Sequence, residues 1–95
     1  MTTYCISYEL HQPDVRREVK LVAALGVFED RCHALGSLWL VCTPWSAEQV
    51  AGYLRRFLNP EDSLLVEPLS VGMGWSGWVG QDVQDWLRKH LGPST

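Results

Sequence analysis

The chain has 95 residues, of which 46% are hydrophobic and 20% are charged, and its net charge is −3. This length allows one small domain with a limited core, and the negative charge excludes a protein that binds nucleic acid over its whole surface. No apolar run approaches the length that spans a membrane, and the first residues lack the pattern of a signal peptide, so we expect a cytoplasmic protein without a membrane partner.

Large apolar side chains alternate with small or polar ones at the start of the chain, which predicts a β-strand. One face of this strand carries Tyr4, Ile6, Tyr8 and Leu10, and the other carries Cys5, Ser7 and Glu9. Glu9 closes the strand just before a turn signal at Gln12-Pro13-Asp14. A carboxylate at a strand end, on a face lined by small residues, can reach a metal ion or a partner.

Two helices are predicted from capping signals and apolar spacing. The first has Asp14 as its N-cap and ends at Gly26, and its apolar residues at helical spacing are Val15, Val19, Val22 and Leu25. The second begins with a capping box of Ser46 and Gln49 and stops at Asn59-Pro60. Its buried stripe is expected to contain Ala47, Val50, Leu54, Phe57 and Leu58.

Three further strands are expected, at residues 28–35, 38–43 and 63–69. A tight turn at Gly36-Ser37 joins the first two, and residues 38–43 are apolar on both faces, as in a central strand that is covered on two sides. The order is therefore strand, helix, strand, strand, helix, strand. We interpret the chain as an α+β, ferredoxin-like βαββαβ fold, with two helices on one face of a four-stranded antiparallel sheet.

Residues 71–95 form an extension beyond this core of residues 1–70 within one domain, 1–95. The extension starts with a glycine- and tryptophan-rich segment and continues with a short helix that Asp82 is expected to cap. The apolar stripe of this helix is Val83, Trp86, Leu87 and Leu91. Because two helices cover only one sheet face, the other face needs the extension, a second copy of the chain, or both. A homodimer is the simplest closed solution.

The motifs, taken in order, resemble a known family. The opening Tyr4-Cys5-Ile6-Ser7-Tyr8-Glu9-Leu10 resembles the T-Y-x-I-S-Y-D-L start of small bacterial proteins labelled the SinR family. These are related to the CRISPR-associated ferredoxin-like proteins that partner the spacer integrase and to virulence-associated protein D. The resemblance continues through His33, residues 37–43 and Ser46-Ala47-Glu48, and it ends at Gly77-Trp78, which is similar to an A-G-W in the family's tail.

The resemblance implies a ferredoxin-like homodimer that acts in antiviral defence or in a mobile-element setting. In nuclease members an aspartate at the end of the first strand is thought to hold a divalent metal, and the matching residue here is Glu9. A glutamate still offers hard oxygen ligands for Mg²⁺ or Mn²⁺, so Glu9 is the candidate catalytic and metal-binding residue of an endonuclease acting on DNA or RNA. The alternative is a structural carboxylate in a non-catalytic protein-interaction module of the same fold.

Candidate contacts outside this strand fall into two groups. The basic residues Arg16, Arg17, Lys20, Arg55 and Arg56 form either a solvated helix surface or a rim that contacts phosphates, and with a negative net charge we expect weak nucleic-acid binding or none. The tail tryptophans are Trp75, Trp78 and Trp86, and they either seal the open sheet face or dock onto a second subunit. Another protein could also bind to this tail or to the edge of the sheet.

The histidines and cysteines suggest no site by themselves. His33 is expected to be a packed or surface residue, and His11, which lies just after Glu9, could approach the same site. Cys5, Cys32 and Cys42 lack metal-binding spacing and are expected to be free thiols rather than a disulfide.

Overall fold

A computed structural model describes all residues from 1 to 95 and contains four strands and three helices. The elements are β1 (Thr2–Glu9), α1 (Val15–Leu25), β2 (Asp30–Leu35), β3 (Leu38–Thr43), α2 (Ala47–Arg55), β4 (Ser63–Leu69) and α3 (Gln81–Leu91). The strands form one antiparallel sheet in the order β2-β3-β1-β4. This is the ferredoxin-like arrangement, so the predicted fold is confirmed.

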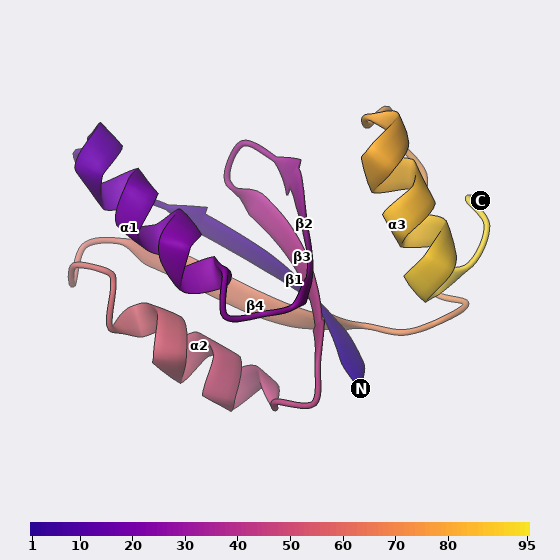
Figure 1. The fold of residues 1–95 in the computed structure, drawn as a ribbon, viewed down its shortest axis with the longest axis horizontal. Helices are drawn as coiled ribbons and strands as arrows, with labels where there is room; N and C mark the ends of the chain where they lie inside the picture. Colours follow the sequence, from indigo (N-terminus) through magenta and orange to yellow (C-terminus); the bar gives the residue numbers. More distant parts are fainter.

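The main core lies between the sheet and the helices α1 and α2, which cover the same face (Figure 1). Alternate residues of β1 point into it, as the period-two pattern predicted, and Trp39 and Val41 of β3 lie beside them. The helices contribute Leu21, Ala24, Leu25, Val50 and Leu54. None of the three helices is both long and apolar enough to cross a bilayer.

Helix α3 lies on the opposite face of the sheet (Figure 1). Its buried residues Val83, Leu87 and Leu91 pack with Cys32 of β2 and Leu40 of β3 in a second, smaller cluster. The extension therefore folds back onto its own sheet and covers the half formed by β2 and β3. The predicted apolar stripe of this helix is correct, with Trp86 half-buried at its side.

Several element ends follow local signals. The Asp14 side chain accepts a hydrogen bond from the backbone N–H of Arg17, and Ser46 and Gln49 form the predicted capping box. Three boundaries differ from expectation: β2 begins at Asp30, α2 ends at Arg55, and Gly80 rather than Asp82 is the N-cap of α3. Asp82 lies in the first turn of α3, where a negative charge is still favourable near the helix N-terminus.

Of the four apolar residues at helical spacing in α1, only Leu25 is buried. Val15, Val19 and Val22 are exposed, whereas Leu21, Ala24 and Leu25 are buried. Both sets are spaced as residues on one side of a helix, so the spacing alone does not decide which side faces the sheet. The larger leucine side chains, placed on the C-terminal half of the helix, fill the space above the sheet.

Strands β2 and β3 form a hairpin with an irregular register. Leu35 pairs with Leu38 next to the turn, but the pairing then shifts, so that His33 lies opposite Trp39 and Asp30 lies opposite Cys42. The shift is a β-bulge at Ala34. It changes which residue of β3 lies across from Asp30.

Candidate functional site

Glu9 lies at the exposed end of β1, where it pairs with Ser63 of β4. Its carboxylate forms neither an ion pair nor a hydrogen bond within the chain. A shallow depression beside it is lined by Ser7, Tyr8, Glu9, Ser63, Leu64 and Leu65. The position at a strand end agrees with the expectation, and the alternative of a structural carboxylate finds no ion-pair partner within the chain.

The residues around Glu9 in one chain do not fit a Mg²⁺ or Mn²⁺ ion. Such ions prefer about six oxygen ligands, and Glu9 supplies one carboxylate. The chain has one group of three metal-ligating side chains within reach of each other, and it does not include Glu9. His11, which is close to Glu9 in sequence, forms no ion pair with it, and its backbone N–H donates to Asp62 instead. A divalent ion at Glu9 would need ligands from a second chain.

The sheet face around Glu9 is uncovered. Helix α3 covers the β2 and β3 half of this face, and Cys5 of β1 and Leu69 of β4 also pack against its cluster, which leaves the rest of β1 and β4 uncovered. We call this the open half-face, and it contains Ser7, Glu9, Ser63, Leu65 and Glu67. The Leu65 residue is 56% exposed, and β4 is also an edge strand with unpaired backbone groups along one side.

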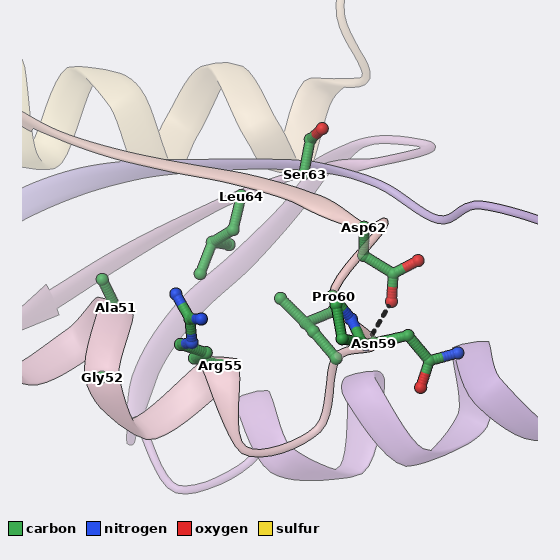
Figure 2. Close-up of a pocket in the computed structure, with 9 residues that line it drawn as sticks. Ala51, Gly52, Arg55, Asn59, Pro60, Asp62, Ser63 and Leu64 are labelled. Atoms are coloured by element: carbon green, nitrogen blue, oxygen red, sulfur yellow. Dashed lines mark hydrogen bonds between the residues drawn. The ribbon is translucent and has the colours of Figure 1, made fainter.

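The basic residues are divided between two depressions. Arg17, Lys20 and Arg56 line a groove between α1 and α2, together with Phe57. Arg55 lies in a second depression between α2 and β4, where Figure 2 shows it projecting beside Leu64. Arg16 is exposed and lines neither. Three of the five predicted residues are therefore brought together, although their positive charge is reduced by an ion pair.

That ion pair joins Arg17 to Asp62. The Asp62 carboxylate also accepts hydrogen bonds from the backbone N–H groups of His11 (2.8 Å) and Asn59 (2.7 Å; Figure 2). Burial of this carboxyl opposes its ionisation, but the N–H donors of Asn59 and His11 and the Arg17 guanidinium outweigh burial and lower its pKa. Asp62 thus ties three segments together, and Arg17 is held in a structural role.

The tail tryptophans have different environments. The Trp75 indole N–H donates to the backbone carbonyl of Gly92 (2.9 Å), and the Trp86 indole N–H donates to Asp30 Oδ1 (2.9 Å). Both side chains are therefore used within the chain. Trp78 is 100% exposed, so it is the one member of the predicted interface set that is free to contact a partner.

The three cysteines are free thiols, as expected. Burial raises the pKa of the Cys5 thiol and of the Cys32 thiol, and nearby carboxylates act in the same direction. A protonated thiol is a poor nucleophile, which argues against cysteine chemistry at these two positions. His33 stacks on Trp39 with ring centroids 4.3 Å apart, so it is a packed surface residue.

One cluster was missed by the sequence analysis. Asp30, Cys42 and His90 come together where α3 meets β2 and β3. These residues are far apart in sequence and form no motif of fixed spacing, so no local signal could have found them.

Comparisons with known proteins support the fold. No family model matches this chain, and no curated protein matches its sequence. The chain is similar in structure to a hypothetical protein, TT1823 from Thermus thermophilus, with a TM-score of 0.62 and 22% sequence identity. The similarity covers 83% of this chain and 94% of that one. It concerns the fold alone.

Proposed function

We propose that the protein is an interaction module of the ferredoxin-like fold whose first partner is a second copy of itself. The observation that carries this proposal is the open half-face, an uncovered part of the sheet beside the unpaired edge of β4. The solvent-facing side of an antiparallel sheet normally carries polar residues. Here Leu65 lies at the centre of the open half-face, and more than half of its surface is exposed. Exposed apolar residues beside an open strand edge favour association.

A second copy fits this surface for two reasons. Two identical faces can bury both Leu65 side chains around one two-fold axis, and this produces a closed assembly. The resemblance of the opening strand to dimeric ferredoxin-like proteins points the same way. In cells, such a dimer would serve in a cytoplasmic defence, anti-defence or mobile-element setting, and Trp78 would remain available to bind another protein.

Sedimentation of wild type and two matched variants tests the proposal. Leu65→Glu places a charge on the open half-face. The control, Leu35→Glu, places a charge on β2, the other edge strand, at a residue of similar exposure (54% for Leu35 and 56% for Leu65). We expect wild type and Leu35→Glu to dimerise at micromolar concentration and Leu65→Glu to remain monomeric. A monomeric wild type would contradict the proposal, as would equal dimerisation of all three proteins.

A second candidate function is metal-dependent endonuclease activity on DNA or RNA, and it rests on the unpaired Glu9 carboxylate. Pairing of two open half-faces would bring acidic residues of both chains together, and like charges at close range favour uptake of a cation. Glu9 from each chain would then supply the oxygen ligands for Mg²⁺ or Mn²⁺ that one chain lacks. Such an ion stabilises the charge that develops on phosphate oxygens during phosphodiester cleavage.

The nuclease candidate is tested by comparing wild type with Glu9→Gln and with Glu67→Gln. Glu67 is the matched control because it is another exposed glutamate of the open half-face. Cleavage that requires Mg²⁺ or Mn²⁺, stops with a chelator, and is lost only in Glu9→Gln would support an enzyme. Cleavage that persists in Glu9→Gln would remove the site, and no cleavage by a dimeric wild type would leave the interaction module.

A further inference from the structure

Three side chains with different donor atoms converge where α3 meets the sheet. Asp30 is the first residue of β2, and Cys42 lies directly opposite it on β3 because of the bulge at Ala34. His90 lies in the last turn of α3. One imidazole nitrogen, one carboxylate oxygen and the thiol sulfur all lie within 4.8 Å of one another.

Two residues of α3 hold the carboxylate in place. Trp86 and His90 are one turn apart, and their rings are in contact with centroids 4.0 Å apart. The Trp86 indole N–H donates to Asp30 Oδ1 (2.9 Å), and His90 Nε2 lies 2.9 Å from Asp30 Oδ2. Trp86 thus occupies one oxygen of Asp30 and leaves the other turned toward His90, in the manner of an outer-shell residue that orients a ligand.

The His90 ring nitrogen is buried without a hydrogen bond. The His90 side chain is only 11% exposed, and its Nε2 atom, although close to Asp30, is not aligned to donate to it. Buried polar atoms without a hydrogen-bond partner are rare because each one destabilises the folded state. An ion placed between the nitrogen and the carboxylate would satisfy both.

We propose that Asp30, Cys42 and His90 bind one Zn²⁺ ion. Sulfur, imidazole nitrogen and carboxylate oxygen together are a ligand set for zinc, whereas Mg²⁺ and Ca²⁺ select oxygen ligands. Tetrahedral zinc with bonds of about 2.0–2.3 Å places its donor atoms roughly 3–4 Å apart, which small side-chain movements reach from the present spacing. The thiolate and the carboxylate balance the charge of the ion.

The site can be reached from solvent on two sides. A depression lined by Met1, Cys42, Leu69 and His90 opens on one side, and another lined by Met1, Asp30, Cys42 and Trp45 opens on the other. Three protein ligands leave the fourth position of the ion for water or another small ligand. The site is separate from the open half-face and does not use Glu9, so it goes beyond the proposed function and is tested independently of it.

Zinc at this position would join α3 to the sheet. The ion would link one residue of α3 to neighbouring residues of two strands, and α3 is otherwise held by a small cluster of apolar contacts and by the hydrogen bond from Trp86 to Asp30. Because metal binding to the folded state adds to folding stability, occupancy should slow local opening of α3.

Zinc titration of the reduced, metal-free protein in competition with a chromophoric chelator tests the proposal. The ligand variants are Cys42→Ser and His90→Asn, and the matched controls are Cys5→Ser, a half-buried thiol like Cys42, and His33→Asn. We expect one Zn²⁺ per chain in wild type and both controls. Loss of an outer-shell partner already weakens metal binding about 10- to 100-fold, so loss of either ligand should weaken it by roughly 100-fold or more.

Two further measurements protect the test against variants that fold poorly. Wild type titrated with Co²⁺ should show a sulfur-to-cobalt charge-transfer band that is absent in Cys42→Ser, and hydrogen exchange of residues 81–91 in wild type should slow when Zn²⁺ is added. The proposal is overturned if wild type binds no zinc at micromolar concentration, or if folded Cys42→Ser and His90→Asn bind zinc as tightly as wild type. If wild type binds no zinc, Asp30 and His90 form only an ion pair.

Discussion

Asp62 is the residue on which the turn after β1, the start of α1 and the loop before β4 depend. Its carboxylate accepts two backbone N–H groups and pairs with Arg17. Because these contacts favour the charged form, the folded-state pKa is lower than the unfolded one. The stabilisation is therefore fully present above the unfolded pKa of about 3.9 and is lost as the pH falls through the folded-state pKa.

The prediction at this scale concerns Asp62→Asn, which keeps the size of the side chain and removes its charge. We expect the variant to unfold at a lower urea concentration than wild type at pH 7, and we expect this difference to shrink below about pH 4, where Asp62 of the unfolded wild type is protonated. The control is Asp85→Asn, because the Asp85–Arg88 pair is exposed and such pairs contribute little. A difference that is unchanged between pH 7 and pH 3 would contradict this account of Asp62.

At the scale of elements, the position of each helix on the sheet decides which of its residues are buried. Helix α1 turns Leu21, Ala24 and Leu25 toward the sheet and leaves its valines in solvent. Helix α3 covers half of the other face and brings His90 to Asp30 and Cys42. These placements create both the open half-face and the three-residue cluster.

The orientation of α1 is tested with two neighbouring residues, Leu21 (1% exposed) and Val22 (39% exposed). Leu21→Ala removes a fully buried side chain and should cost about 2–5 kcal/mol of unfolding free energy. Val22→Ala should be nearly neutral, within roughly 0.5 kcal/mol, because alanine favours the helix and little apolar surface is lost. Chemical denaturation measures both, and a larger loss for Val22→Ala would show that the helix is turned the other way.

The fold could be predicted from the sequence where the signals are local. The alternation in β1, the capping box at Ser46 and Gln49, and the turn at Gly36-Ser37 each depend on neighbouring residues, and together they define the order of elements. The orientation of α1 could not be predicted, because two sets of apolar residues have helical spacing and only contact with the sheet selects one.

The candidate sites also differ in whether local sequence signals could predict them. Glu9 could be placed at the exposed end of a strand from the sequence alone. The cluster of Asp30, Cys42 and His90 could not be found, because a regular hairpin about Gly36-Ser37 would place Asp30 opposite Thr43. The bulge shifts this pairing to Cys42, and the packing of α3, which no local spacing encodes, supplies His90.

For the whole molecule, charge and surface determine which partners are available. The net charge is −3, and of the three basic residues in the groove between α1 and α2, Arg17 is neutralised by Asp62. Lys20 and Arg56 remain. The open half-face, by contrast, presents Leu65 between two glutamates, a surface suited to protein rather than to phosphate.

We predict that the groove gives only weak binding to nucleic acid. With two free cations, the logarithm of the binding constant for duplex DNA should fall with the logarithm of the salt concentration at a slope of roughly −2. Binding should therefore be nearly lost at about 0.2 M salt, which is close to physiological ionic strength. Fluorescence anisotropy with duplex DNA and with RNA measures this. The double variant Lys20→Ala/Arg56→Ala should remove the residual binding and Arg88→Ala on α3 should not, whereas tight binding by wild type at 0.2 M salt would contradict the prediction.

The central claim is that the open half-face binds a second copy of the chain, and hydrogen exchange at two protein concentrations tests it most directly. The two edge strands of the sheet serve as target and internal control: β4 borders the open half-face, and β2 lies under α3. We predict that residues 63–69 exchange more slowly at the concentration where the protein is dimeric, while residues 30–35 exchange at the same rate at both concentrations. Exchange in β4 that does not change with protein concentration would contradict the claim.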